Sequence, residues 1–307
     1  MTYKASSSMS IKDWIFALRL HQWAKNILVF VPLILSQRYD NLEALFTVFI
    51  AFFVFGLVAS ANYLINDMMD LDSDRKHLTK KNRPIASGKL SKRKAIIAVI
   101  ILLLGAISFV FILPSIFFSA IALYLTITIL YSLVLKRIVI MDVIVLAGLY
   151  TMRIISGALV IETLPTFWLL AFSMFLFLSL ALIKRYTELR LLKISIEEAD
   201  DSVAIHGRKY VIEDMPILQI MGLGSGLLAV LVFALYINSS EIKMLYEVPE
   251  VLWFALPVLL FWITRMWLLT NRGLMHEDPV VFALTDSASL IAAFSMAIFL
   301  WLATVFL

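Results

Sequence analysis

Long apolar runs divided by short polar segments make up most of this chain. The runs at 44–57 and 95–112 carry no charged residue, whereas the strands of a membrane β-barrel alternate apolar and polar positions over about ten residues. A helix needs roughly 20 residues to cross the hydrocarbon core of a bilayer. The pattern therefore predicts nine membrane-spanning helices, at about 14–36, 42–68, 94–113, 115–135, 138–161, 165–184, 213–237, 250–270 and 280–305.

Composition supports this prediction and excludes other classes of protein. The 307 residues are 62% hydrophobic and only 16% charged, against about 45–50% and 25% in soluble domains. We therefore expect an all-α integral membrane protein with a single membrane domain over 1–307. The chain has no cysteine, which excludes disulfides and thiolate sites, and its four histidines form no H-E-x-x-H pair of the kind that binds zinc.

The basic residues predict the orientation in the membrane. With nine spans, 23 of the 26 Lys and Arg residues fall on one side, and cytoplasmic loops are the ones enriched in these residues. The N-terminus is therefore predicted to be cytoplasmic and the C-terminus external. These loops also explain the net charge of +4, so no nucleic-acid partner is expected. The two longest loops, about 69–93 and 185–212, lie on the cytoplasmic side, where a soluble substrate would enter.

Carboxylate and amide side chains cluster where the second predicted span ends, in a segment that reads NDMMDLDSD at 66–74. If the helix continues, positions three and four apart share one face, and these are Tyr63, Asn66, Asp70 and Asp74, with Asp67 at the edge. Several oxygen ligands on one face suit Mg²⁺, which commonly joins a few protein oxygens to a diphosphate. The alternative is an acidic, solvated helix end that only terminates the span.

Basic residues follow this motif closely. Lys80, Lys81 and Arg83 come within ten residues of its end, and fixed cations beside a metal site are what a diphosphate leaving group requires. The alternative for these residues is ordinary cytoplasmic loop charge.

Arg153 lies about four turns inside the fifth predicted span. An arginine at this depth is costly, so it should face the bundle interior and meet an anion. A substrate phosphate, a carboxylate such as Asp70 and a purely structural ion pair are all open.

Further basic residues stand at predicted cytoplasmic helix ends: Lys25, Lys136, Lys184 and Arg185. Together they predict a basic ring around the acidic motif, suited to a substrate with several phosphates. Taken singly, each is also explained by a side chain that reaches from the helix end to the lipid headgroups.

These motifs resemble the UbiA-type intramembrane prenyltransferase superfamily, whose first aspartate motif matches Asn66-Asp67-x-x-Asp70-x-x-x-Asp74. Other segments narrow the resemblance to the branch of decaprenyl-phosphate phosphoribosyltransferases. These are Gln22-Trp23-x-Lys25-Asn26, Arg83-Pro84-Ile85-Ala86-x-Gly88, Tyr131-x-x-x-Leu135-Lys136, Lys184-Arg185-x-x-Glu188-Leu189 and Asp278-Pro279-Val280-Val281-Phe282-Ala283-Leu284. The resemblance extends from about Leu18 to Phe294.

The resemblance implies a nine-helix bundle whose central cavity opens to the cytoplasm and to lipid, in a bacterial inner membrane. It implies Mg²⁺-dependent transfer of 5-phosphoribosyl from phosphoribosyl pyrophosphate to a polyprenyl phosphate, a step toward lipid-linked arabinose donors; oligomeric state stays open. Asn66 and Asp70 would hold the metal, and Asp67, Asp70, Asp74 and Arg153 would act in catalysis, with Asp67 or Asp74 free to orient ribose hydroxyls instead. The residues expected to bind substrate are Lys25, Tyr63, Lys80, Lys81, Arg83, Tyr131, Lys136, Lys184 and Arg185.

One departure from the superfamily concerns its second aspartate-rich motif, in the loop between the sixth and seventh spans. Here the acidic segment 197–201 is displaced beyond Lys184 and Arg185, and we do not expect a second metal site there. Two other functions remain open on sequence grounds. One is prenyl transfer from a prenyl diphosphate to an aromatic or haem-like acceptor; the other is transport of a lipid or polyol phosphate without chemistry.

Overall fold

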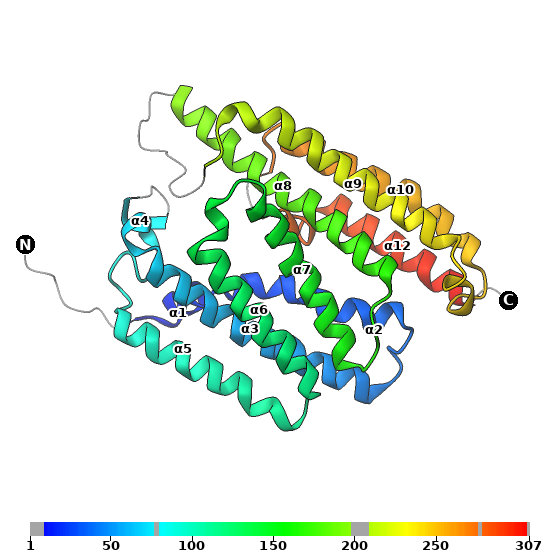
Figure 1. Ribbon diagram of the computed structural model, residues 1–307, viewed down its shortest axis with the longest axis horizontal. Helices are drawn as coiled ribbons and strands as arrows, with labels where there is room; N and C mark the ends of the chain where they lie inside the picture. The colour runs from blue at the N-terminus through cyan, green and yellow to red at the C-terminus, as the bar shows by residue number, and fades with distance from the viewer. Residues whose placement is uncertain (1–8, 77–79, 198–208, 276–277, 306–307) are drawn as a thin grey trace, which may run out of the picture. The chain divides into compact units, whose positions relative to one another are not determined.

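A computed structural model of the chain describes residues 9–76, 80–197, 209–275 and 278–305 (Figure 1). The described residues form helices and no β-strand. The α-helices are α1 (Ile11–Ala17), α2 (Val31–Leu35), α3 (Leu42–Met69), α4 (Leu71–Lys76), α5 (Lys92–Ile107), α6 (Ser115–Leu133), α7 (Met141–Val160), α8 (Phe167–Glu197), α9 (Met215–Ile237), α10 (Ala255–Asn271), α11 (Pro279–Ala283) and α12 (Ser287–Val305). The 3₁₀ segments are η1 (Leu20–Phe30), η2 (Lys80–Asn82), η3 (Ser108–Phe111), η4 (Leu135–Arg137), η5 (Ile212–Asp214), η6 (Ile242–Met244) and η7 (Pro249–Phe254).

Within the described residues, seven helices are long and apolar enough to cross a membrane. They are Leu42–Met69, Ser115–Leu133, Met141–Val160, Phe167–Ile194, Ile212–Ile237, Pro249–Asn271 and Ser287–Thr304. Each corresponds to one of the predicted spans. The other two predicted spans take different forms: α5 and η3 together cover 92–111, and the region at 14–36 is divided among α1, η1 and α2.

The chain divides into two compact units, which are described separately. Unit 1 comprises Met1–Lys136, Met152–Leu164 and Ser195–Gly207, and unit 2 comprises Arg137–Thr151, Pro165–Ile194 and Arg208–Leu307. Helix α7 thus has its first half in unit 2 and its second half in unit 1.

In unit 1 the segment η1 is wound as a 3₁₀ helix over 11 residues. Residues three apart in such a helix stand in one row, and the row of Trp23, Asn26 and Val29 contacts the rest of the unit. Trp23 packs against Gly56 and donates a hydrogen bond to Ser60 Oγ at 3.0 Å. The contacts of Asn26 and Val29 belong to the site described below.

Unit 2 is held by close helix contacts at small residues, as is usual between helices in membranes. A side chain at Gly222 of α9 would overlap the Trp267 ring of α10, and Gly226 lies against Ile263 of α10. Trp267 also donates to Ser179 Oγ of α8 at 3.0 Å. These contacts pack α9 and α8 against α10.

The structure changes what is known of the two predicted loops. The predicted cytoplasmic loop at 185–212 is helical up to Glu197, because α8 continues for three further turns beyond the apolar stretch. Lys184 and Arg185 therefore lie inside a helix, where their backbone groups are bonded, and not at a helix end. The predicted loop at 69–93 likewise contains α4 and η2.

Candidate functional site

The acidic motif bends at Asp70. Helix α3 ends at Met69, and Asp70 is its C-cap with φ −90° and ψ 8°. The backbone bonds from Asp70 N to Asn66 O (2.9 Å) and from Asp74 N to Asp70 O (2.8 Å) carry the helical path on into α4. The helix therefore continues past Asp70 with a local distortion, and the carboxylates of the motif divide between two sets of cations.

Asp67 and Asp74, seven positions apart, share one cation. Arg83 Nη1 lies 3.1 Å from Asp67 Oδ1 and 2.7 Å from Asp74 Oδ2, and both carboxylates are only 4% exposed. Asp67, expected at the edge of the acidic face, is thus one of its most buried members. Asp72 is exposed, as its position in the motif predicts.

Arg19 is a member of this cluster that the sequence analysis missed. Its Nη2 lies 2.6 Å from Asp67 Oδ1, and its guanidinium stands over the Tyr63 ring at 4.7 Å from the centroid. The residue sits in the left-handed backbone region (φ 50°, ψ 48°), between α1 and η1. This turn directs the arginine side chain toward Asp67 of α3. The hydropathy pattern does not predict such a turn.

Asp70 faces a different cation. Both of its oxygens accept hydrogen bonds from Lys136 Nζ at 2.8 Å, and its side chain is 29% exposed. Lys136 belongs to η4, directly after α6, whose last turns carry the half-buried Tyr131. Asp70 and Lys136, both predicted site residues, are 66 positions apart in the chain and lie in direct contact in the fold.

A packed turn holds Arg83 in place. Pro84, Ile85 and Ala86 are buried, and Ile85 belongs to a hydrophobic cluster that also contains Leu64 of α3. Gly88 closes the turn with φ +80°, a conformation that favours glycine. Lys80 and Lys81, in η2, precede this turn; Lys81 is exposed and Lys80 half-buried.

A second, more deeply buried group of polar residues lies in unit 1. Arg153 of α7 is 5% exposed; its Nε donates to Asn26 Oδ1 at 3.1 Å and its Nη2 to Tyr124 Oη at 2.9 Å. Lys25, directly before Asn26 in η1, is also buried, at 6% exposure. Two residues predicted to bind substrate or act on it, Lys25 and Arg153, are thus buried in unit 1.

Gly157, one turn beyond Arg153, permits this arrangement. A Cβ at this position would overlap the backbone carbonyl of Val29 in η1. The absence of a side chain therefore lets η1 approach α7 closely enough for Asn26 to reach Arg153.

Lys184 and Arg185 belong to unit 2 and have different surroundings. Lys184 Nζ donates to Asp278 Oδ2 at 2.9 Å, and Tyr150 Oη donates to Asp278 Oδ1 at 3.3 Å. Asp278 also caps the N-terminus of α11 by accepting from Val280 N. It was noted in the sequence only as part of a family motif, not as a site residue.

Arg185 is fully buried. It pairs with Asp142, also fully buried, at 2.7 Å, and with the carboxylate of Glu188. Tyr210 Oη donates to Asp142 at 2.5 Å and accepts from Ile140 N, and burial followed by this bond to a carboxylate raises the pKa of the Tyr210 hydroxyl. Arg185 is therefore engaged in a structural network within unit 2, whereas Lys184 is one-third exposed.

The acidic end of α3 offers one accessible carboxylate to a metal ion. In the described ranges, no three His, Cys, Asp or Glu side chains gather in a way that could hold an ion. Asp70 is the accessible carboxylate, and Asn66 lies one turn before it; Asp67 and Asp74 are buried against arginines. This donor set fits Mg²⁺, which is usually held by one or two carboxylates together with substrate phosphates. Residues 198–201 of the other acidic segment lie outside the described residues.

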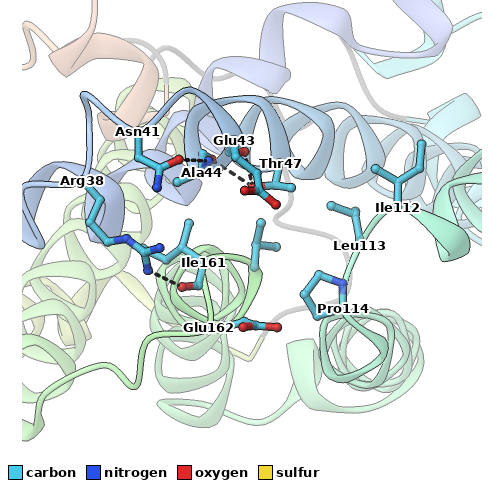
Figure 2. A pocket seen from close by; sticks show the side chains of 11 residues that line it. Arg38, Asn41, Glu43, Ala44, Thr47, Ile112, Leu113, Pro114, Ile161 and Glu162 are labelled. Atoms are coloured by element: carbon cyan, nitrogen blue, oxygen red, sulfur yellow. Dashed lines mark hydrogen bonds between the residues drawn. The ribbon is translucent and has the colours of Figure 1, made fainter.

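A separate pocket lies where α3 begins, at the opposite end of that helix from Asp70. Figure 2 shows Arg38, Glu43 and Glu162 around it, and its volume is about 460 Å³. Arg38 Nη1 donates to the carbonyl oxygen of Ile161 at 2.7 Å. None of the predicted site residues lines this pocket.

Comparisons with known proteins extend over nearly the whole chain. An uncharacterized protein, y4nM, of Sinorhizobium fredii is 37% identical over 289 residues, which cover 94% of this chain and 55% of that protein. The chain therefore spans about half the length of that relative. Nodulation protein NoeC of Azorhizobium caulinodans is 32% identical over 92% of this chain and 90% of its own length. A decaprenyl-phosphate phosphoribosyltransferase of Mycobacterium tuberculosis is 34% identical over 57% of this chain and 59% of its own.

Solved structures show the same fold. A UbiA homologue from Archaeoglobus fulgidus bound to GPP and Mg²⁺ has a TM-score of 0.69 at 15% identity, covering 95% of this chain and 99% of that one. A model of the UbiA prenyltransferase family matches residues 27–273, a range that includes the acidic motif, Arg83, Lys136 and Arg153. The protein is therefore a membrane-embedded, all-helical member of the UbiA prenyltransferase family.

Proposed function

We propose that this protein transfers the 5-phosphoribosyl group of phosphoribosyl pyrophosphate to a polyprenyl phosphate of the decaprenyl type and releases diphosphate. The reaction would depend on Mg²⁺ and supply a precursor of lipid-linked arabinose donors. Relatives named decaprenyl-phosphate phosphoribosyltransferase support this proposal over part of the chain.

One observation carries the choice of donor: the buried polar layer formed by Lys25, Asn26, Tyr124 and Arg153. Burying two cationic side chains is costly unless the surroundings use them. A prenyl diphosphate carries hydrocarbon directly after its diphosphate. Hydrocarbon packed against these side chains would keep water away from their charges without offering a polar partner in its place. Phosphoribosyl pyrophosphate carries hydroxyls and a second phosphate there, which suit amide, phenol and cationic groups.

The acidic end of α3 would hold the diphosphate by an exchange of partners. Asp67, Asp70 and Asp74 are paired with Arg19, Arg83 and Lys136, so three negative and three positive charges offset one another. With a diphosphate bound, these cations would turn to its oxygens. Asp70 and Asn66 would then be the residues that hold Mg²⁺. Arginine suits phosphate oxygens because its planar fork donates two parallel hydrogen bonds.

The bond from ribose C1 to the diphosphate oxygen breaks, and diphosphate leaves with the electron pair. A phosphate oxygen of the lipid forms the new bond to C1, and no proton has to move because that oxygen is already anionic. Bound Mg²⁺ would neutralise the charge that develops on the leaving group. Arg19, Arg83 and Lys136 stabilise the same charge.

We further infer that nine segments span the membrane, with the N-terminus cytoplasmic. The seven apolar helices would be joined by α5 with η3 and by η1 with α2. In this arrangement the acidic end of α3 faces the cytoplasm of a bacterial inner membrane, where phosphoribosyl pyrophosphate is available.

The test is transfer of label from phosphoribosyl pyrophosphate, labelled in the ribose, to the organic phase in membranes with Mg²⁺ and polyprenyl phosphate. Label should move with the native protein and not with Asp70→Asn. Asp72→Asn, in the same motif but exposed, is the matched control and should remain active. Label that stays aqueous with the native protein contradicts the proposal.

A second function, prenyl transfer from a prenyl diphosphate, has its own support in the fold shared with the A. fulgidus homologue bound to GPP. It predicts that prenyl diphosphate is consumed with an aromatic or haem-like acceptor while ribose label stays aqueous. If neither donor releases diphosphate and substrate only crosses the membrane, the protein is a transporter.

A further inference from the structure

Asn62 occupies a special position on α3. Four residues before Asn66 and seven after Phe55, it lies on the same face as both, about 6 Å from the first and about 10 Å from the second along the axis. The Arg153 guanidinium stands 5.9 Å from the centre of the Phe55 ring. Asn62 is therefore placed between the acidic end of α3 and the level of Arg153.

The side-chain oxygen of Asn62 has no hydrogen-bond partner, although the residue is only 6% exposed. A buried acceptor without a donor is unfavourable and rare in folded proteins. A residue of similar size without polar atoms, such as leucine, would fill the position without this cost. The amide is therefore better explained by a ligand than by the packing of α3.

Asn26 presents the complementary atom. It is 1% exposed, and its Nδ2 has no partner. Because the guanidinium of Arg153 can only donate, the Asn26 oxygen must face it, and the Nδ2 donor is fixed in the other direction. Asn62 and Asn26 thus offer an unused acceptor and an unused donor, both neutral.

We propose that Asn62 and Asn26 select the sugar phosphate half of the donor. Asn62 accepts a hydrogen bond from a ribose hydroxyl, and Asn26 donates one to a sugar or phosphate oxygen near Arg153. This inference rests on the proposed function. It assigns discrimination between a sugar and a hydrocarbon to neutral amides, and charge neutralisation to the motif at the end of α3. A site built to bind a hydroxyl rejects a ligand that lacks it, because its own polar atom is then left unpaired.

The test uses competitors of the labelled phosphoribosyl pyrophosphate reaction: ribose 5-phosphate and its 2-deoxy and 3-deoxy analogues. Native protein should bind ribose 5-phosphate about 10-fold more tightly than at least one analogue. In Asn62→Leu this preference should fall to about 1, while inhibition by inorganic diphosphate changes by less than about twofold. Asn62→Thr, which keeps an acceptor oxygen, should retain part of the preference.

Thr47→Val is the matched control, since it removes a hydroxyl from the opposite end of α3, where its partners are backbone carbonyls; it should keep the full preference. Persistence of the preference in Asn62→Leu overturns the inference, as does equal weakening of diphosphate and sugar phosphate. Unfolding of Asn62→Leu also overturns it, because that outcome gives the amide a structural role. Native protein that neither uses phosphoribosyl pyrophosphate nor binds ribose 5-phosphate refutes the proposed function instead.

Discussion

Replacing Arg83 with methionine should separate the structural from the catalytic role of the charged cluster. Arg83 Nη1 is bonded to both Asp67 and Asp74, and its own side chain is 20% exposed. Methionine keeps much of the length and packing of the side chain and removes its charge. Asp67 keeps Arg19, whereas Asp74, at 4% exposure, loses the cation that lies 2.7 Å away.

The expected loss of stability follows from the uncompensated charge on Asp74. Removing one partner of a buried ion pair costs about 3–5 kcal/mol because the remaining charge is left uncompensated. Arg83 is partly exposed and Asp67 retains a partner, so we expect the free energy of unfolding to fall by about 2–3 kcal/mol. At roughly 2–4 °C per kcal/mol, the melting temperature should fall by roughly 4–12 °C.

The assay is thermal unfolding in detergent, with Asp74→Asn added to Arg83→Met as the compensating change. The double variant removes the isolated charge and should recover most of the lost stability, yet remain inactive because it lacks the guanidinium that we propose to bind phosphate. If Arg83→Met is as stable as the native protein, or if Asp74→Asn restores nothing, the charges do not balance one another as argued.

Two further predictions concern residues that contact, or lie in, the first 30 residues of the chain. Gly157→Ala should be strongly destabilising in thermal unfolding because its Cβ would overlap the Val29 carbonyl, whereas Gly148→Ala on the same helix, with nothing within 4 Å, should be tolerated; equal effects would refute the close approach. The pKa of Asp13 is lowered to about 2, chiefly by the hydrogen bond from the Ser10 hydroxyl. The stability difference between native protein and Asp13→Asn should therefore be constant above the ordinary value of 3.8 and shrink as the pH falls through about 2; a difference that does not change with pH would contradict this.

Hydrophobic runs were sufficient to predict where most of the helices lie, because a bilayer span requires a long apolar segment whatever its partners are. They did not predict how η1 is wound, since α and 3₁₀ geometry need the same apolar residues and differ only in hydrogen bonding. The hydrophobic runs also predicted an end of α8 near 184, whereas the helix continues to Glu197. Its charged continuation is held by tertiary partners, such as Asp142 for Arg185 and the carbonyl of Asn271 for Arg190.

The candidate site was predictable where chemistry clusters in the sequence. Arg83 lies nine residues from Asp74, and its pairing follows from that proximity. Arg19 is 48 residues from Asp67, and its sequence neighbourhood looks like ordinary loop charge. Only the left-handed turn at Arg19 reveals the contact. The orphaned amide atoms of Asn26 and Asn62 are likewise visible only once burial is known.

The tight winding of η1 makes the site sensitive to the pitch of a single segment. Successive residues turn by about 120° in a 3₁₀ helix and by about 100° in an α-helix. If Leu20–Phe30 rewound to α geometry, Val29 would rotate about 120° around the axis relative to Trp23. Asn26 would swing by half as much, away from Arg153. The winding of this segment thus determines which of its residues face α3 and which face α7. A single inserted or deleted residue there would misplace its contacts with both helices.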